Sequence, residues 1–209
     1  MSEVTGPLKG LRVFDLTRVL AGPTCAQMLG DLGADVIKIE RPGSGDDTRG
    51  FAPPYISGTK ESAYFVGVNR NKRSLTLDVA KPEGQEVALQ LLERSDILVE
   101  NFKVGGLRRY GLAYEQIKDR FPRLIYCSIT GFGQTGPYAK RPGYDSLIQA
   151  MGGVMSLTGE PDGEPQKVGV PVGDLFAGLY GCIGILAALR HREATGRGQQ
   201  IDIGMLDAH

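Results

Sequence analysis

The sequence is poor in the residues that build disulfide frameworks, zinc sites and hydrolase triads. Three cysteines and two histidines occur among its 209 residues. Cys25, Cys127 and Cys182 lie far apart and outside any CxxC or Cys/His ligand spacing, so we expect neither a disulfide framework nor a metal site. No GxSxG elbow accompanies His191 or His209, the only candidates for a histidine base. A serine or cysteine hydrolase is therefore not favoured.

The chain also lacks an excess of charge and a long apolar run. Lys and Arg number 24 together, as do Asp and Glu, so net charge gives no reason to expect nucleic acid or a membrane surface as a partner. The first ten residues, MSEVTGPLKG, have neither the apolar core of a signal peptide nor an Arg-rich amphipathic pattern. The longest apolar run, 175–189, is shorter than the roughly 18 residues of a membrane span and predicts a buried core helix. We expect a cytoplasmic protein.

Short β-branched runs alternate with helical patterns along the whole chain. Strands and helices that alternate at this spacing predict βαβ units, hence an α/β fold with a mostly parallel sheet. Two long irregular stretches, 41–60 and 131–143, are of a length that is usually functional or mobile in a compact domain. The predicted strands are 11–16, 35–40, 73–78, 96–101, 123–130 and 199–205, and the predicted helices are 22–32, 83–94, 114–120, 144–152 and 174–192.

A glycine-rich motif, GFGQTG at 131–136, follows one of the predicted strands. It matches GxGxxG, which in that position can bind a dinucleotide. However, Pro137 and a polar stretch through Gly143 follow it where a helix is required, and no acidic residue ends a second strand about 20 positions on. A glycine-rich connection between strand and loop is the preferred interpretation, and a nicotinamide-binding site stays the alternative.

One carboxylate interrupts the apolar stretch VGVPVGDLFAGLYG at 168–181. A charge carried into apolar surroundings costs several kcal/mol or more unless something stabilises it. Asp174 stands where the N-cap of the following helix belongs, and Asp is a preferred N-cap residue. A catalytic role is the second interpretation. The two are compatible, because a helix N-terminus also stabilises negative charge that develops on a nearby acyl intermediate.

Basic residues gather at strand ends and in loops. Most such residues are solvated surface charges. Arg18, Arg41 and Arg109 nevertheless follow predicted strands, and ligands of open α/β sheets bind beyond the carboxyl ends of the strands. A polyphosphate bound there would need several cations. The basic residues in question are Arg18, Lys38, Arg41, Arg70, Lys72, Arg73, Arg108, Arg109, Lys140 and Arg141.

Several segments together, in order and spacing, resemble the N-terminal part of the class III CoA-transferases. This family includes the formyl-CoA, carnitine and succinyl-CoA-dependent dicarboxylate transferases. The resemblance implies a Rossmann-like, mostly parallel sheet, with residues 1–209 forming a CoA-binding domain that looks truncated before the second half and its small domain. It also implies an interlocked homodimer for the full-length protein. The segments are LKGLRVFDLTRVLAGPTCAQMLGDLGADVIKIERPGSGDDTR, NRNKRSLTLD, ILVENF, IYCSITGFGQTGP, RPGYDSLIQAMGG, VGDLFAGLYG and TGRGQQIDIGMLDA.

The resemblance implies that Asp174 is a nucleophile that passes through aspartyl anhydride and aspartyl-CoA intermediates. Coenzyme A enters as part of the acyl-CoA substrate; no metal and no tightly bound cofactor are implied. Val19, Leu20 and Ala21 would line the thiol arm, and Tyr144 and Asp145 would lie near the thioester. Arg41 would lie near the nucleotide phosphates, and Leu77, Asn101, Phe102 and Arg109 would bracket the adenosine and diphosphate.

Two departures from the family bear on the substrate. Formyl-CoA transferases have glutamine where this chain has Leu20, which cannot donate the same hydrogen bond, so RVLAGP instead resembles members that use succinyl-CoA and dicarboxylates. The basic position two residues before Tyr144 is Pro142, which leaves Lys140 or Arg141 as substitutes.

Two alternatives stay open. The related α-methylacyl-CoA racemases use the histidine of a GHD motif, and this chain has GYD; a phenol with a pKa of about 10 is a poor base at neutral pH. The other alternative is an inactive CoA-binding fragment, because in the family the glycine-rich loop that closes the active site belongs to the second half. Exposed apolar patches would favour that fragment.

Overall fold

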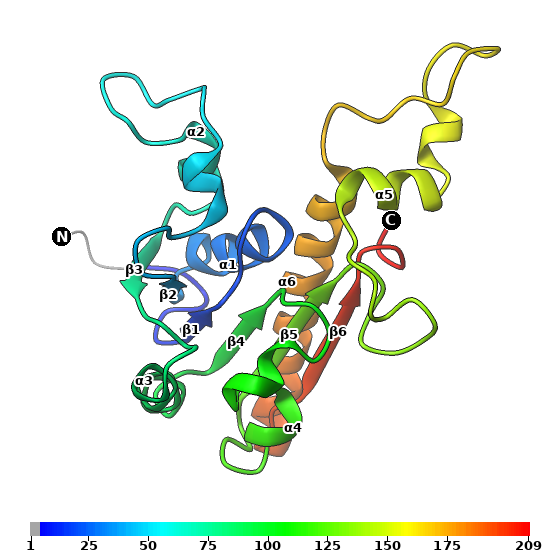
Figure 1. Cartoon of the computed structure of the whole chain (residues 1–209). Coiled ribbons are helices and arrows are strands. Elements are labelled where there is room, and N and C mark those ends of the chain that lie inside the picture. The colour runs from blue at the N-terminus through cyan, green and yellow to red at the C-terminus, as the bar shows by residue number, and fades with distance from the viewer. Residues whose placement is uncertain (1–4) are drawn as a thin grey trace.

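Parallel strands form the centre of the molecule (Figure 1). The computed structural model describes residues 5–209, and within them the sheet order is β3-β2-β1-β4-β5-β6, with every neighbouring pair parallel. This is the strand order of the Rossmann fold. The chain first adds β2 and β3 on one side of β1 and then adds β4, β5 and β6 on the other side, so the order of addition reverses between β1 and β4. The strands are β1 (Arg12–Asp15), β2 (Asp35–Glu40), β3 (Lys72–Thr76), β4 (Ile97–Glu100), β5 (Ile125–Thr130) and β6 (Gln200–Gly204).

The α/β fold predicted from the periodicity is confirmed, and every predicted strand and helix has a counterpart within a few residues. The elements that the pattern did not predict are short and lie in connections. One of them, the five-residue α2, begins after Ser62, whose hydroxyl accepts a hydrogen bond from the Phe65 N–H. The helices are α1 (Ala21–Asp31), α2 (Ala63–Gly67), α3 (Pro82–Leu92), α4 (Tyr114–Ile117), α5 (Asp145–Met151) and α6 (Val172–Thr195), and the 3₁₀ turns are η1 (Asp47–Gly50), η2 (Gly106–Tyr110) and η3 (Val154–Leu157).

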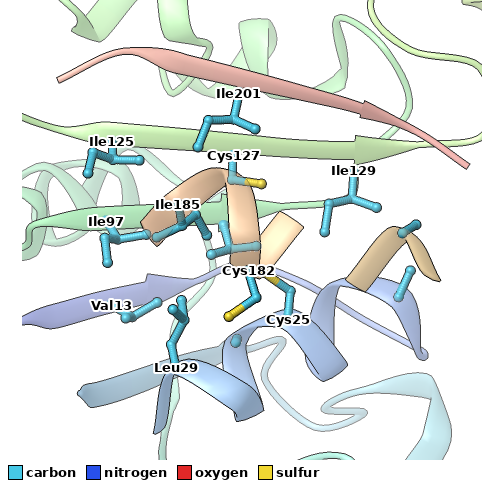
Figure 2. Close-up of a cluster of buried hydrophobic side chains, with 14 of the residues drawn as sticks. Val13, Cys25, Leu29, Ile97, Ile125, Cys127, Ile129, Cys182, Ile185 and Ile201 are labelled. Carbon is cyan, nitrogen blue, oxygen red and sulfur yellow. The ribbon is translucent and has the colours of Figure 1, made fainter. Parts of the chain in front are cut away.

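Each face of the sheet has its own hydrophobic core. Adjacent strand residues point to opposite faces, so Val13 lies in one core and Phe14 in the other. The first core lies between the sheet and helices α1 and α6, and Figure 2 shows the three cysteines there as buried free thiols. The second core includes Ala88 and Leu92 of α3 and Ile117 of α4. Helices on both faces explain why the strands are apolar runs instead of alternating ones.

Helix α6 is longer than its apolar run predicts. It has 24 residues, and an 18-residue window has a mean hydropathy of 1.8, so its length and composition alone would suffice to cross a membrane. The prediction that this segment is too short was wrong, because polar residues at both ends also join the helix. Its position matches the predicted core helix: nine of its residues are buried, and it packs on α1, β5 and β6.

Glycines let α1 and α6 approach each other closely. A Cβ at Gly178 would lie 2.8 Å from the Ala21 carbonyl oxygen and 3.1 Å from the Thr24 Cβ. A Cβ at Gly181 would lie 3.1 Å from the Cys25 Sγ. Side chains at these positions would therefore push the helices apart, and the N-terminal ends of both helices would separate with them.

Candidate active site

The loop between β1 and α1 lies at the point where the strand order reverses, which is where open α/β sheets bind ligands. The Asn101 side chain, just after β4, fixes this loop. Its Oδ1 accepts a hydrogen bond from the Arg18 N–H at 2.9 Å, and its Nδ2 donates one to the Arg18 carbonyl at 2.7 Å. The Arg18 guanidinium also lies 5.6 Å from the Phe102 ring centroid. Thus Asn101 and Phe102, both predicted CoA contacts, meet the predicted thiol-arm loop.

Val19 has a strained backbone. Its φ is +70°, in the left-handed region that a β-branched side chain rarely adopts. Such a conformation costs about 1–3 kcal/mol, persists only where its surroundings enforce it, and is concentrated at ligand clamps and active sites. The three predicted thiol-arm residues therefore sit in a turn that the rest of the fold must hold.

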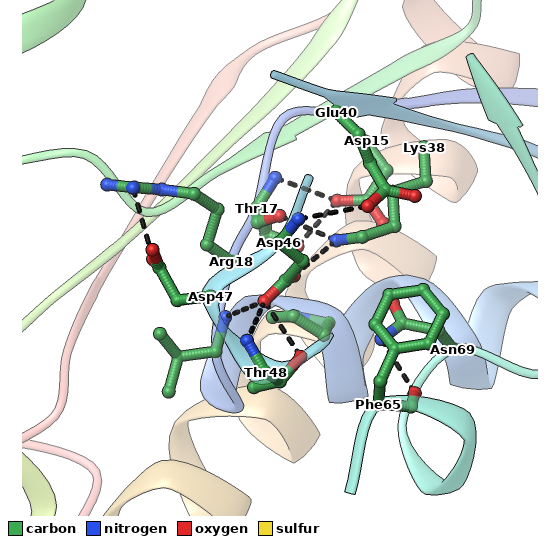
Figure 3. A network of polar contacts seen from close by, with 12 residues as sticks. Asp15, Thr17, Arg18, Lys38, Glu40, Asp46, Asp47, Thr48, Phe65 and Asn69 are labelled. Carbon is green, nitrogen blue, oxygen red and sulfur yellow. Dashed lines mark hydrogen bonds and ion pairs between the residues drawn. The ribbon is translucent and has the colours of Figure 1, made fainter. Parts of the chain in front are cut away.

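Two buried lysines lie beneath this loop, as Figure 3 shows for Lys38. Lys38 donates a hydrogen bond to the Thr17 carbonyl at 2.8 Å, and its Nζ lies 2.8 Å from Asp46 Oδ2. Lys72 pairs with Asp15 at 3.0 Å and donates a hydrogen bond to the Pro23 carbonyl at 2.9 Å. Both lysines were candidates for a polyphosphate site. Because each is buried and paired with a carboxylate, neither ammonium faces an external ligand.

Several of the other predicted cations form ion pairs, among them Arg18, whose guanidinium lies 3.2 Å from Asp47 Oδ2. Arg70 pairs with Asp31, and Arg73 pairs with Asp35 at the start of β2, so these arginines belong to surface ion pairs. Arg41 and Arg109 lie exposed beyond β2 and β4, and no carboxylate among residues 5–209 pairs with either guanidinium. Arg41 directly follows β2 and Arg109 lies in η2, and their phosphate role stays a prediction.

The predicted N-cap role of Asp174 was wrong. Helix α6 begins at Val172, its N-cap is Pro171, and Asp174 lies inside the first turn without capping its own helix. Instead, the Asp174 carboxylate faces the N-terminus of α1, and the Ala21 backbone N–H lowers the pKa of that carboxyl. Positive charge at the N-termini of two helices therefore surrounds this carboxylate.

Asp174 has a perturbed acidity. Burial is the main cause that raises its pKa to about 6, the nearby Asp145 carboxylate raises it further, and the Ala21 N–H acts in the opposite direction. A carboxylate with this pKa is mostly ionised at neutral pH yet poorly solvated. Burial together with a specific charged neighbour marks a candidate functional residue.

Asp145 takes over the capping role at α6. Its Oδ1 accepts a hydrogen bond from the Gly173 N–H at 2.9 Å, and its Oδ2 accepts one from Gln149 Nε2 at 2.7 Å. Only 9% of Asp145 is exposed. Its carboxylate is thus committed to internal bonds, and it acts on the site by fixing the turn that carries Asp174. Tyr144, the other residue predicted near the thioester, is 73% exposed as the N-cap of α5.

The other predicted contacts are apolar. Leu20 is buried directly before α1, and Leu77 is half-buried and packs against the second core. Both side chains therefore belong partly to the hydrophobic core, and Leu20 presents no polar group to a ligand.

Two residues at this site were missed by the sequence analysis. Tyr64 of α2 has its pKa raised by burial and by the charges of Asp174, Asp145 and Asp46, so its phenol lies within the electrostatic field of these carboxylates. Asp46, in the irregular stretch 41–60, binds the Val19 turn. The length of that stretch was the only signal for Asp46, because no local pattern predicts which side chains of a loop fold inward, and nothing in the sequence singled out Tyr64.

GFGQTG has a structural explanation. A Cβ at Gly131 would lie 2.5 Å from the Gly143 Cα, and a Cβ at Gly143 would lie 2.4 Å from the Gly131 Cα. The two ends of this loop therefore cross where only glycine fits. A dinucleotide site would require a helix directly after the motif, but the next helix, α5, begins only at Asp145.

Two hollows lie elsewhere. One, about 40 Å³, is lined in part by Glu100 and Ser128, where burial raises the pKa of Glu100 to about 7 and its carboxylate accepts the Phe102 N–H at 2.8 Å. The other, about 250 Å³, lies between Leu8 and α6 residues that include Leu186. Neither includes Asp174. No cluster of three or more potential metal ligands occurs in residues 5–209.

Comparison with known proteins identifies the family. The family model described as CoA-transferase family III matches residues 8–209. The chain belongs to this family. This class III chain is 52% identical over 205 residues to a succinate–glutarate CoA-transferase of Agrobacterium fabrum, with 96% of the chain and 51% of the relative covered. It is 47% identical over 213 residues to an acetyl-CoA:oxalate CoA-transferase of Acetobacter aceti, with 99% and 54% covered.

A solved structure gives the same family. The chain matches a CaiB/BaiF family protein from Brucella suis with 56% identity and a TM-score of 0.94, covering 97% of this chain and 54% of that one. The class III chain thus spans about half the length of the curated relatives and of the solved structure that it matches.

Proposed function

We propose that this chain forms the CoA-binding and nucleophilic part of an acyl-CoA:carboxylate CoA-transferase, with Asp174 as the nucleophile. The observation that carries the proposal is the placement of Asp174: a half-buried carboxylate of raised pKa, in contact with the N-terminus of α1 and beside the strained Val19 turn. Family membership supports it, since the relatives are named for this reaction.

In the proposed reaction, Asp174 divides one difficult exchange into several easier steps. An Asp174 carboxylate oxygen attacks the thioester carbonyl, and the carbon–sulfur bond breaks to give a mixed anhydride and CoA thiolate. The thiolate attacks the aspartyl carbonyl, which releases the donor carboxylate and leaves an aspartyl-CoA thioester. The acceptor carboxylate then displaces the thiolate, forming a second anhydride. Thiolate attack on the acceptor's acyl carbon releases the new acyl-CoA and regenerates the Asp174 carboxylate.

The contacts with CoA follow from the same placement. The Val19 turn would lie along the thiol arm, and the exposed guanidinium groups of Arg41 and Arg109 would bind phosphate oxygens bidentately. We propose succinyl-CoA as donor and a small dicarboxylate as acceptor, because buried Leu20 offers no hydrogen-bond donor to a formyl group. The buried thiols Cys25, Cys127 and Cys182 suit a reducing, cytoplasmic compartment. We do not propose a racemase, because Tyr144 offers a phenol, a poor base at neutral pH, and no side chain among residues 5–209 hydrogen-bonds to its hydroxyl.

A second candidate is a CoA-binding half-site that requires more polypeptide for turnover. It is favoured by an apolar face of α6, comprising Phe176, Leu179, Tyr180, Ile183 and Leu186, which is exposed. Apolar faces of this kind mark interaction sites. The family resemblance implies a homodimer of the full-length protein, and we propose that a second copy associates through this face.

The test is to trap the acyl intermediate. The protein is incubated with succinyl-CoA, treated with hydroxylamine, digested and analysed by mass spectrometry, with Asp174→Asn as the matched control. A hydroxamate at Asp174, absent from the variant, is the expected result. CoA binding measured by calorimetry without any hydroxamate would support the second candidate instead. Turnover by Asp174→Asn at an appreciable fraction of the parent rate would refute the nucleophile. Equal turnover with formyl-CoA and oxalate would overturn the proposed substrates.

A further inference from the structure

The buried pair of Lys38 and Asp46 forms and breaks no bond in the proposed chemistry. Only 1% of the Lys38 side chain and none of the Asp46 side chain is exposed, and their charged atoms lie 2.8 Å apart. Removing two charges from water costs several kcal/mol per ion, so a buried pair is weak support for stability by itself. The contacts around the pair indicate what else it does.

Asp46 uses both of its carboxylate oxygens. Its Oδ2 faces Lys38, while its Oδ1 accepts hydrogen bonds from the Val19 N–H at 3.3 Å, the Thr48 N–H at 3.0 Å and the Thr48 hydroxyl at 2.8 Å. Lys38 opposes the burial of Asp46 and holds the pKa of that carboxyl below its ordinary value. An ionised carboxylate is therefore fixed directly against the strained Val19, and Figure 3 shows Asp46 with its partners Lys38 and Thr48.

Asp46 is itself held in place. Its N–H donates a hydrogen bond to Glu40 Oε2 at 2.9 Å, and Arg49 binds the same glutamate through two contacts of 2.7 Å. Glu40 is the last residue of β2, so the sheet anchors the segment that carries Asp46. Lys38, also in β2, completes the connection by its bond to the Thr17 carbonyl.

The turn held in this way leads directly to Asp174. Ala21 comes two residues after Val19, and its N–H favours the ionised form of Asp174. The two helices are in contact here, since a Cβ at Gly178, one turn beyond Asp174, would lie 2.8 Å from the Ala21 carbonyl oxygen. The other titratable groups beside Asp174 are Asp145 of α5 and Tyr64 of α2.

We propose that Lys38 and Asp46 are positioning residues: together they hold Val19 in its left-handed conformation, which places the Ala21 N–H against the Asp174 carboxylate. The importance of this placement for catalysis rests on the proposed function. The placement itself does not, and it can be tested without any acyl-CoA.

The experiment is a ¹³C NMR titration of the Asp174 carboxyl in the parent protein and in Asp46→Asn. Asparagine keeps an oxygen for the Val19 N–H but loses the charge that pairs with Lys38. If the turn relaxes and the Ala21 N–H moves away from Asp174, the Asp174 midpoint should rise by about one pH unit, because that N–H favours the charged form. The ionised fraction at pH 6 would then fall about fivefold, and acylation by succinyl-CoA at that pH would fall with it.

A second background tests the role of backbone strain. Glycine adopts positive φ without a steric cost, so in Val19→Gly the turn no longer needs Asp46 to hold it. The shift caused by Asp46→Asn should fall to less than half in this background, as a double-mutant cycle detects. An equal shift in both backgrounds would contradict the proposal.

The matched control is Asp96→Asn. Asp96 also forms an ion pair with a largely buried cation, Arg192, at 3.0 Å. Asp96 directly precedes β4, so this pair lies at the amino ends of the strands, opposite the end that carries the Val19 turn. This variant should lose stability without moving the Asp174 titration.

Two further outcomes keep the test decisive. If Asp46→Asn does not fold, Thr48→Val replaces it, since this variant removes only the hydroxyl bond to Asp46 Oδ1 and should move the midpoint upward by less. An unchanged midpoint in folded Asp46→Asn or Thr48→Val overturns the proposal. A shifted midpoint in a protein that forms no hydroxamate refutes the proposed function alone.

Discussion

At the scale of single residues, the charge on Asp174 has a cost that pH controls. Its pKa is raised from 3.8 to about 6, so the ionised form is less favourable in the folded protein than in the unfolded chain. The penalty is absent below pH 4, develops between pH 4 and 6, and is complete above pH 6. Above pH 6 the ionised Asp174 therefore lowers the free energy of unfolding. A residue that lowers stability in this way is typical of groups retained for function.

The first prediction concerns Asp174→Asn. Asparagine can still accept the Ala21 N–H but is never ionised, so we expect the variant to be more stable than the parent by about 1–2 kcal/mol at pH 7.5. The difference should vanish near pH 4. Urea unfolding at both pH values measures it, with Asp162→Asn, an exposed carboxylate, as the control that changes neither. A variant less stable than the parent at pH 7.5 would mean that the folded protein favours the charge.

At the scale of elements, the contact between α1 and α6 brings the site together. Asp174 and Ala21 belong to different helices, and the two helices are close because Gly178 and Gly181 carry no side chains. The Val19 turn, anchored by β2 and by Asn101 after β4, sets the start of α1. Two helices and two strands therefore determine how the Ala21 N–H faces the Asp174 carboxylate.

The second prediction concerns Gly178→Ala. Alanine favours helix by about 1 kcal/mol, but its Cβ would lie 2.8 Å from the Ala21 carbonyl oxygen, and overpacking costs about 1–3 kcal/mol. We expect a net loss of about 1–2 kcal/mol in urea unfolding together with a raised Asp174 midpoint by NMR. Gly67→Ala is the control, because no atom lies within 4 Å of a Cβ there. An unchanged midpoint in Gly178→Ala would show that the helices can separate without disturbing the site.

At the scale of the whole molecule, the exposed apolar face of α6 sets its behaviour in solution. The five residues recur at spacings of three and four, so they lie along one side of the helix. The opposite side packs on the sheet, as the orange helix behind β5 and β6 in Figure 1 shows. A helix that is apolar on both sides needs a second partner.

The third prediction concerns association. The protein should associate at micromolar concentrations, and Ile183→Asp, at a position 57% exposed at the centre of the face, should make it monomeric in sedimentation velocity. Leu157→Asp is the matched control: this leucine is 84% exposed but lies in η3, away from α6. A monomeric parent, or equal effects of both variants, would contradict association through this face.

The sequence by itself determined the elements and their order. Apolar periodicity and capping signals are local, so they predicted every strand of the sheet and, within a few residues, the longer helices. Asp174 was identified as a candidate because a lone carboxylate in an apolar stretch stands out in the sequence. The glycines of GFGQTG were correctly assigned to a connection, although their crossing partner Gly143 was not evident.

Only the tertiary structure decided how charged residues are used. Lys38 and Lys72 look like free cations in the sequence, yet both are buried opposite carboxylates from other segments. The carboxylate that accepts a backbone N–H from the first turn of α6 belongs to Asp145 of α5, not to Asp174 of α6 itself. A hydrogen bond depends on distance in space, so its partner can come from another helix. Ion pairs, caps and strained turns join residues far apart in the chain, so no local pattern encodes which partners meet.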